Sequence, residues 1–180
     1  EYQLTPQVRT AFNMLINEVD SLRLDVEQLQ LSLAEAEASA DHDALAHVYN
    51  RRAFVRETQR VVAMVKRHEI EASLIYFDLN NFKAINDAHG HPAGDEVIRT
   101  VGELLIRQTR ETDIVGRIGG DEFAVVLTHV NAEAAMVKAE TLVAAMCTEK
   151  ILHNGVPLHI SAAYGITQLI AGHTAERALA

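Results

Sequence analysis

The sequence predicts an α+β fold, in which a long N-terminal helix precedes a domain of mixed helices and strands. Up to residue 40, apolar residues recur at alternating intervals of four and three, which is the heptad pattern of a coiled-coil helix. Farther along, an apolar run at 72–78 ends in an aspartate. Two glycines at 119–120 then separate two short apolar runs. The last two features predict a buried strand and a β-hairpin.

The composition indicates one domain of ordinary size with an appendage. The chain has 180 residues, of which 48% are hydrophobic and 23% charged, and a net charge of −9 at pH 7. Because nucleic-acid-binding surfaces are basic, we do not expect this acidic chain to bind nucleic acid. Neither a signal peptide nor an apolar run of about 18 residues is present, so we expect a cytoplasmic chain with no transmembrane segment. We expect the single cysteine, Cys147, to be a small buried residue.

Residues 1–40 are expected to form a dimerising coiled coil, and residues 41–180 a separate domain. β-Branched residues at position a with leucine at position d favour a parallel, two-stranded coil. The alternative is a single amphipathic helix that packs on its own domain, but the apolar seam is narrow and the other faces are polar, which favours a homodimer. The a positions are Phe12, Val19, Val26 and Leu33, and the d positions are Leu15, Leu22 and Leu29.

The next segments predict a helix and then a strand. Residues 50–68 place Phe54, Val61, Val62 and Val65 on one apolar side, as an amphipathic helix does. The short apolar run at 72–78 reads as a buried strand, with Asp78 at its C-terminal end. Ligands of open α/β-type sheets tend to bind at such strand ends.

Residues 80–87 run from a loop into the start of a helix. Backbone N–H groups at a helix start can hold phosphate oxygens, and Lys83 adds a positive charge there. Residues 89–95 predict a turn, after which Asp95 begins a helix that ends near Gln108.

Residues 117–123 read RIGGDEF and predict a tight turn between two strands. Glycine takes the positive φ of primed hairpin turns without steric cost, which explains the pair at 119–120. Taken alone, the segment is an ordinary acidic hairpin. Together with Asp78 and Lys83, its two carboxylates could hold one or two Mg²⁺ ions against a nucleotide triphosphate. The order of a strand, two helices and a hairpin also resembles the palm-type layout of nucleotidyl transferases.

The same residues resemble the GGDEF domain of diguanylate cyclases. The strings that carry the resemblance are FDLNNFKAIND at 77–87, GHPAGD at 90–95 and GGDEF at 119–123. It covers roughly residues 41–180 and implies a palm-like, nucleotidyl-cyclase-like fold. In that fold a central, mainly antiparallel sheet is surrounded by helices in the order βααββαβ. The implied reaction joins two GTP molecules into cyclic di-GMP and releases pyrophosphate.

The resemblance also implies roles for single residues. Mg²⁺, or Mn²⁺ as an alternative, would be bound by Asp78, the Leu79 carbonyl, Asp121 and Glu122. Asp121 would also be the candidate base for the attacking 3′-hydroxyl, and Lys83 would stabilise charge on the phosphates. Asn86 and Asp95 would read the guanine edge, because a carboxylate accepts from guanine N1–H and N2–H₂ but meets unpaired acceptors on adenine. The other substrate-binding residues would be Phe82, His91, Gly119 and Gly120; His91 could equally be a turn residue that supports the loop.

The segment Arg110-Glu111-Thr112-Asp113 resembles the Arg-x-x-Asp product-inhibition site of the family. Arginine can pair with guanine O6 and N7, and aspartate can accept from the N1 edge. The expected partners are therefore GTP as substrate, cyclic di-GMP as product and inhibitor, and a second copy of the chain. Two alternatives are a non-catalytic receptor of cyclic di-GMP and a scaffold with a vestigial domain. The intact motif at 119–123 argues against both.

The sequence departs from the family pattern in three places. Ala46 and His47 replace a threonine and a glycine in the segment that connects the coil to the domain. Asn80 stands where the family often has an aspartate, so no metal is assigned to it. A closing strand is expected at 159–167, but the C-terminal helix that carries a lysine and an arginine for the terminal phosphates is expected to be absent from the chain, which ends at Ala180.

Overall fold

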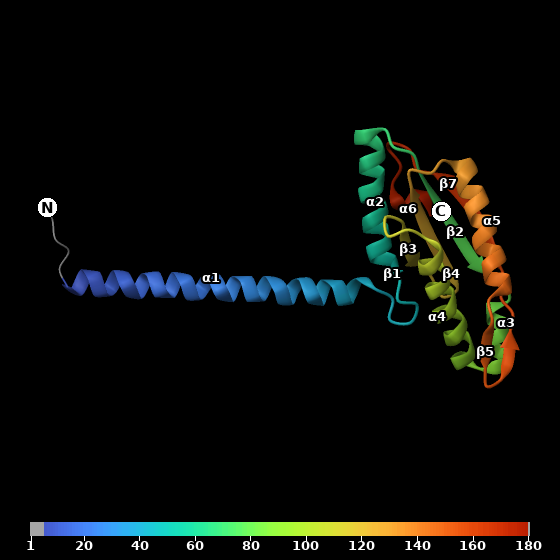
Figure 1. Ribbon diagram of the computed structural model, residues 1–180, viewed down its shortest axis with the longest axis horizontal. Coiled ribbons are helices and arrows are strands. Elements are labelled where there is room, and N and C mark those ends of the chain that lie inside the picture. Colours follow the sequence, from blue (N-terminus) through green and yellow to red (C-terminus); the bar gives the residue numbers. More distant parts are fainter. Residues whose placement is uncertain (1–5, 180) are drawn as a thin grey trace. The chain divides into compact units, whose positions relative to one another are not determined.

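The computed structural model describes residues 6–179, and the chain divides into two compact units, Glu1–Ala40 and Asp41–Ala180. The first unit consists of helix α1 (Pro6–Asp41), whose last residue belongs to the second unit (Figure 1). The side chains of Phe12 and Leu33 lie outside the described part of the chain. No helix in that part is both long and apolar enough to cross a membrane. The predicted heptad side chains that are described are all exposed: Leu15, Val19, Leu22, Val26 and Leu29.

Within residues 41–179, the second unit is built on a five-stranded sheet in the order β1-β3-β4-β2-β7. β1 runs parallel to β3, and the other neighbouring strands are antiparallel. The expected α+β fold with a central, mainly antiparallel sheet is therefore confirmed. From β2 to β7, the elements of this sheet and its helices follow the order βααββαβ. The strands are β1 (Tyr49–Asn50), β2 (Ala72–Leu79), β3 (Ile114–Arg117), β4 (Glu122–Thr128) and β7 (Ala162–Gln168).

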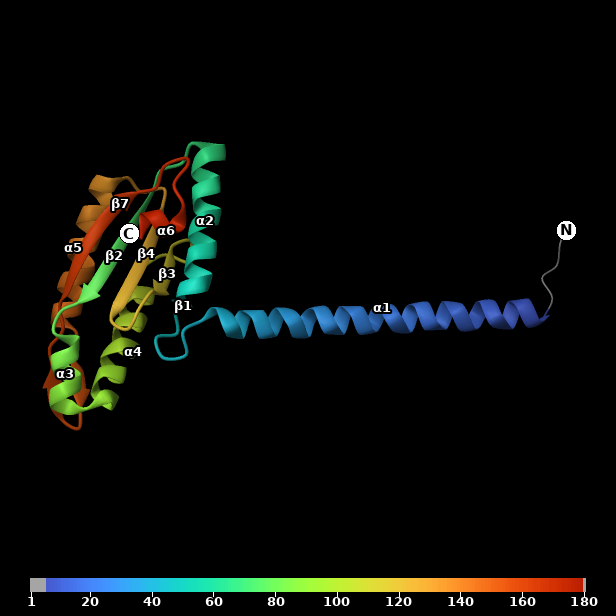
Figure 2. The same ribbon diagram turned by 180° about the vertical axis from the view of Figure 1, so that it is seen from behind.

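Helices cover both faces of the sheet, as Figures 1 and 2 show from opposite sides. Successive side chains of a strand point to opposite faces, so β2 directs Ile75 and Phe77 toward α4 and α5, and Leu74 toward α2 and α6. Two hydrophobic cores result, one on each face. The helices are α2 (Arg51–His68), α3 (Phe82–His89), α4 (His91–Gln108), α5 (Ala132–Thr148) and α6 (Ala175–Ala178), and β5 (Ile151–His153) pairs with β6 (Val156–Leu158) in a separate hairpin.

The elements that frame the predicted site form as expected. α2 begins after Asn50, whose side-chain oxygen accepts a hydrogen bond from the Ala53 N–H at 3.0 Å, an N-cap that favours a helix start. Phe54, Val61 and Val62 are buried on its inner side. β2, β3 and β4 also follow the predicted strand and hairpin.

Several boundaries differ from the prediction. α4 begins at His91 and not at Asp95, because Pro92 stands in its first turn, where proline is tolerated, and Gly90 turns the chain there with a φ of 83°. β7 starts at Ala162, later than expected. The β5–β6 hairpin and α6 were not predicted. The expectation of a buried cysteine is wrong, because Cys147 is exposed on α5.

His47 has a φ of 56°, in the left-handed region that glycine adopts without steric cost. We expect His47→Gly to raise the free energy of unfolding by about 0.5 kcal/mol, because relief of roughly 1–2 kcal/mol of left-handed strain exceeds the entropy cost of glycine, about 0.5–1 kcal/mol. Denaturant unfolding would measure the change. The control His89→Gly, at an exposed helical position in α3, should lower stability. A loss of stability in His47→Gly would contradict the strain argument.

Candidate active site

Two carboxylates of the predicted site face each other across neighbouring strands. Asp78 at the end of β2 lies directly opposite Glu122 at the start of β4. Beside them, the Leu79 N–H donates to the Asp121 carbonyl oxygen at 3.1 Å. Cβ atoms of directly opposed residues on one face are about 4.5–5.5 Å apart, and like charges there repel. A cation between the two carboxylates would remove this repulsion.

The carboxylate oxygens at this strand end suit a hard divalent cation that keeps part of its hydration shell. In the described part of the chain, no three His, Cys, Asp or Glu side chains gather into a ready metal site. Mg²⁺ is usually held by one or two protein carboxylates, with waters and substrate phosphates as its remaining ligands. The facing pair of Asp78 and Glu122 suits that arrangement.

Gly119 and Gly120 suit this turn for a different reason than the positive φ that we predicted. Neither Gly119 nor Gly120 adopts a positive φ, so the turn does not depend on left-handed backbone. A Cβ on Gly119 would lie 1.9 Å from Glu122 Oε2, whereas a Cβ on Gly120 would meet no protein atom within 4 Å. Gly119 therefore makes room for the Glu122 carboxylate, and Gly120 leaves the turn open on its outer side.

Tyr76 lies on the same sheet face as Asp78, two residues earlier on β2. The pKa of its hydroxyl is raised above its ordinary value by burial, by a hydrogen bond to Glu122 and by the charges of Glu122 and Asp78, and Arg51 opposes this shift. The Tyr76 hydroxyl is thus a neighbour of both carboxylates. Sequence analysis missed it, although the period-two alternation of the strand could have indicated it.

Arg117 links the glycine turn to the connecting segment, residues 42–49. Its Nε and Nη2 donate to the Gly120 carbonyl oxygen at 3.2 and 2.7 Å, and its Nη1 donates to Asp43 Oδ1 at 3.1 Å. Asp43 Oδ1 also accepts from the N–H groups of Leu45 and Ala46. Burial raises the pKa of Asp43, but these two N–H bonds and Arg117 outweigh burial and hold it below the ordinary value. Sequence analysis assigned neither side chain a role in this link.

The residues expected to contact the nucleotide come from α3 and α4. Asn86 is half-buried, and its Oδ1 lies where a Cβ on Gly94 would be only 2.1 Å away. The absence of that Cβ lets the Asn86 side chain lie against α4, directly before Asp95. The other predicted residues also lie on these two helices. Lys83, His91 and Asp95 are exposed, and Phe82 is half-buried at the start of α3.

Residues 40–180 match the protein family described as "Diguanylate cyclase, GGDEF domain". The chain belongs to this family. Its GGDEF domain is 34% identical over 143 residues to the probable diguanylate cyclase DgcE of Escherichia coli. The aligned residues make up 79% of this chain and 13% of that protein. Diguanylate cyclase DgcS of Shewanella oneidensis is 32% identical over 179 residues, which covers 99% of this chain and 60% of that protein. The chain thus spans less than two thirds of the length of either relative.

Solved structures support the fold. The GGDEF domain of TpbB (YfiN) from Pseudomonas aeruginosa superposes with a TM-score of 0.71 at 34% identity, over 77% of this chain and 81% of that chain. The coiled coil and GGDEF domain of DgcB from Caulobacter crescentus, solved in complex with c-di-GMP, gives a TM-score of 0.80 over 92% of this chain and 88% of that chain. At 24% identity, the second likeness speaks for the fold alone.

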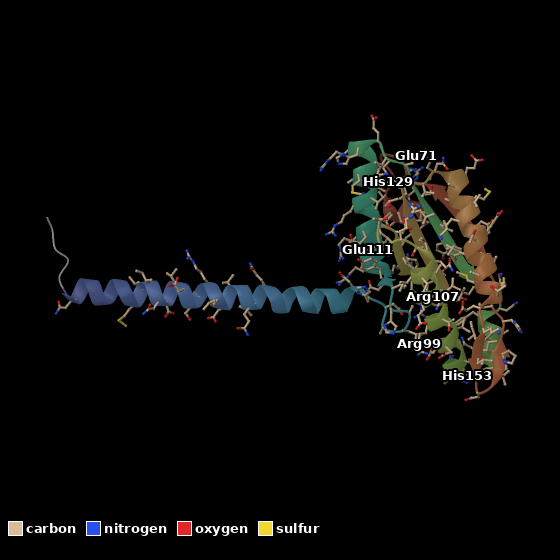
Figure 3. The ribbon with its side chains drawn as sticks, in the orientation of Figure 1. Glu71, Arg99, Arg107, Glu111, His129 and His153 are labelled. Carbon is tan, nitrogen blue, oxygen red and sulfur yellow. The ribbon has the colours of Figure 1, made fainter. Side chains whose placement is uncertain are left out.

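The predicted inhibitory segment of this GGDEF domain is a closed turn between α4 and β3. The Asp113 N–H donates to the Arg110 carbonyl oxygen at 3.0 Å, and the Arg110 N–H donates to Asp113 Oδ2, also at 3.0 Å. Asp113 Oδ1 accepts from the Thr128 N–H at 3.3 Å. Asp113 therefore holds the turn together, while Arg110 is exposed. Figure 3 labels Glu111 in this turn.

Asn80, which stands where the family often has an aspartate, fastens the end of β2 to the segment before β7. Its Nδ2 donates to Ser161 Oγ at 3.0 Å, and its backbone N–H donates to the Ser161 carbonyl oxygen at 2.8 Å. A carboxylate could not donate the first of these hydrogen bonds, although it could accept one from the serine hydroxyl. The amide therefore has a structural partner of its own.

Proposed function

We propose that this domain is the catalytic part of a diguanylate cyclase, which joins two GTP molecules into cyclic di-GMP and releases pyrophosphate. The observation that carries the proposal is the facing pair of Asp78 and Glu122, with Asp121 in the turn beside them. A protein that only binds a cyclic dinucleotide does not need several carboxylates at a strand end. The names of the curated relatives support the same activity.

Mg²⁺ is the cation that we propose for this site, with Mn²⁺ as an alternative. When bound, the ion would neutralise charge on the triphosphate and so favour phosphoryl transfer. Its ligands from the chain would be Asp78, Asp121, Glu122 and the Leu79 carbonyl oxygen. Lys83, exposed on the first turn of α3, would add positive charge at the phosphates.

Asp121 would combine two roles, as a metal ligand and as the acceptor of the proton from the attacking 3′-hydroxyl. A carboxylate is an efficient general base only when its pKa approaches the working pH. We therefore regard the ligand role as the larger contribution. Gly120 would let the nucleotide approach the backbone closely, because the space outside it is free of protein atoms within 4 Å.

Asn86 and Asp95 would select guanine, and Gly94 would keep Asn86 in position. We expect Gly94→Ala to raise the KM for GTP about three- to tenfold, the effect of one lost hydrogen bond, because the new Cβ would force Asn86 Oδ1 to move. Preference for GTP over ATP should fall as well. Steady-state kinetics with both nucleotides would measure this change. The matched control Gly165→Ala adds a Cβ in open space and should keep the KM of the wild type.

We propose that α1 pairs with the same helix of a second copy in a coiled coil. Its described heptad residues, such as Leu22 and Leu29, are 53% and 69% exposed in the single chain, so pairing would remove apolar surface from water. Each domain would hold one GTP, and each new phosphodiester bond joins two of them. The coil would raise the effective concentration of the second half-site. Because GTP is a cytoplasmic nucleotide, we place the reaction in the cytoplasm.

We propose Arg110 and Asp113 as the site where the product inhibits the enzyme. Arg110→Ala is expected to weaken inhibition by cyclic di-GMP about tenfold or more, because a hydrogen bond to a charged group contributes roughly 1.5–3 kcal/mol. Initial rates at increasing product concentration would give the inhibition constant. Arg99→Ala, which removes an exposed arginine paired with Glu96 on α4, is the control and should leave inhibition unchanged. Equal inhibition constants in Arg110→Ala and wild type would place the inhibitory site elsewhere.

Product analysis tests the activity directly. Purified protein incubated with GTP and Mg²⁺ should yield cyclic di-GMP and pyrophosphate, and sedimentation under the same conditions should give a dimer. A chain that binds GTP and Mg²⁺ but forms no product would contradict the cyclase assignment. A chain that turns over as a monomer would contradict only the role of the coil.

A further inference from the structure

A hollow of about 410 Å³ lies between the connecting segment and the Arg110–Asp113 turn. This volume falls within the range of small-molecule sites, about 300–1,000 Å³. His42, His47 and Tyr49 line it on one side, and Arg110, Glu111 and Asp113 line it on the other. The hollow therefore adds a second wall to the proposed product site, made of residues to which neither the family motifs nor the comparisons assign a role.

The wall formed by the connecting segment carries a flat aromatic surface. The rings of His42 and Tyr49 stack with their centroids 5.0 Å apart and an angle of 27° between the planes. A backbone bridge also pairs the two residues, so the stack belongs to the folded segment. Nucleic-acid bases stack readily on such aromatic side chains. A guanine base could therefore lie against this pair while Arg110 reaches it from the opposite wall.

The charges around the hollow depend on pH. The turn contributes the guanidinium of Arg110 and the carboxylates of Glu111 and Asp113, so its fixed charges leave a negative excess. Between about pH 5 and pH 8, side-chain carboxyls are ordinarily negative and guanidinium groups positive, whereas imidazole changes its charge in this range. Protonation of His42 and His47 would therefore change the balance in the hollow from negative to positive.

We propose that this hollow holds one guanine and the adjoining phosphate of cyclic di-GMP, and that protonation of His42 and His47 tightens product binding as the pH falls. The inference rests on the proposed product site at Arg110 and Asp113, and it adds a second wall and a pH response. Each charged imidazole would attract the phosphate and offset the two carboxylates of the turn.

Direct binding tests the inference without relying on turnover. Calorimetric titration of the full chain with cyclic di-GMP is expected to give about fivefold tighter binding near pH 6 than near pH 8, the size of an exposed charge interaction. The double variant His42→Asn/His47→Asn should lose most of this ratio. Asparagine tolerates the left-handed backbone of His47, and the single variant His47→Gly is a second test if the double variant unfolds. The control His153→Asn changes a half-buried histidine on β5, which lies well apart from Glu111 in Figure 3, and should keep the ratio.

The outcomes separate this inference from the proposed function. Equal affinity at the two pH values, or an unchanged ratio in both histidine variants, would overturn the histidine wall and leave the cyclase activity untouched. No binding of cyclic di-GMP to a chain that still converts GTP would overturn both the hollow and the product site. A pH-dependent affinity that the histidine variants lose, in a chain that forms no product, would support the hollow and contradict the cyclase.

Discussion

Asp78→Asn is expected to lower the formation of cyclic di-GMP at least about a hundredfold, because a bound metal contributes several kcal/mol to such a transfer. The same variant should be slightly more stable than the wild type in the absence of metal. Asp78 and Glu122 lie in register on neighbouring strands, and removal of a like-charge pair at such a position stabilises by about 0.2–1 kcal/mol. The two effects have opposite signs because the facing carboxylates repel each other in the metal-free fold, whereas a bound cation would need both of them.

Thermal unfolding with and without Mg²⁺ measures the stability half of this prediction. The wild type should gain stability when the ion is added, since a ligand that binds the folded state stabilises it. Asp78→Asn should gain little. Asp87→Asn, at an exposed position on α3, makes the same chemical change away from the pair and should behave as the wild type in both assays. Turnover close to the wild-type rate in Asp78→Asn would remove this residue from the mechanism.

Local patterns made much of the fold predictable. The run at 72–78 ends in a charged residue after buried ones, and the glycine pair stands between two apolar runs, so β2, β3 and β4 followed from the sequence. Motif strings then indicated the family, which residues 40–180 match. The start of α4 was missed, because glycine and proline at 90–92 usually mark a turn, whereas here they join two consecutive helices.

Interactions between distant residues could not be read from the sequence in the same way. Asp43 and Arg117 are 74 residues apart, and their pairing follows no period of a helix or strand. The reason for Gly119 is likewise three-dimensional, since the atom that excludes a Cβ belongs to the Glu122 side chain. The hydroxyl of Tyr76 meets Glu122 only because β2 and β4 pair in one particular register.

Arg117→Ala is expected to lower turnover about 10- to 100-fold, because it removes the side chain that fixes the glycine turn to the connecting segment. Arg117 donates twice to the Gly120 carbonyl oxygen and also contacts both oxygens of Asp43. A small displacement of groups that position a reacting atom can cost about a hundredfold in rate. Without Arg117, the turn that carries Asp121 loses the side chain that joins it to Asp43 of the connecting segment.

A graded series separates the positioning of this turn from a simple loss of charge. Arg117→Lys keeps the charge, but an ammonium group is a point donor and cannot reproduce the planar fork, so we expect an intermediate rate. Asp43→Asn retains an oxygen that accepts from Leu45, Ala46 and Arg117, so its effect should be the smallest. Because the two side chains act through one contact, the double variant Asp43→Asn/Arg117→Ala should be no slower than Arg117→Ala alone.

Arg107→Ala is the matched control for this series. Arg107 pairs with Glu149 at 3.1 Å on the domain surface, where an ion pair contributes at most about 1 kcal/mol, and neither residue touches the turn. Its loss should leave the rate of cyclic di-GMP formation unchanged. A rate for Arg117→Ala equal to that of Arg107→Ala would mean that the turn holds its shape without the connecting segment. If the rates fall in the order Asp43→Asn, Arg117→Lys, Arg117→Ala, the connecting segment helps to position the carboxylates that we propose as metal ligands.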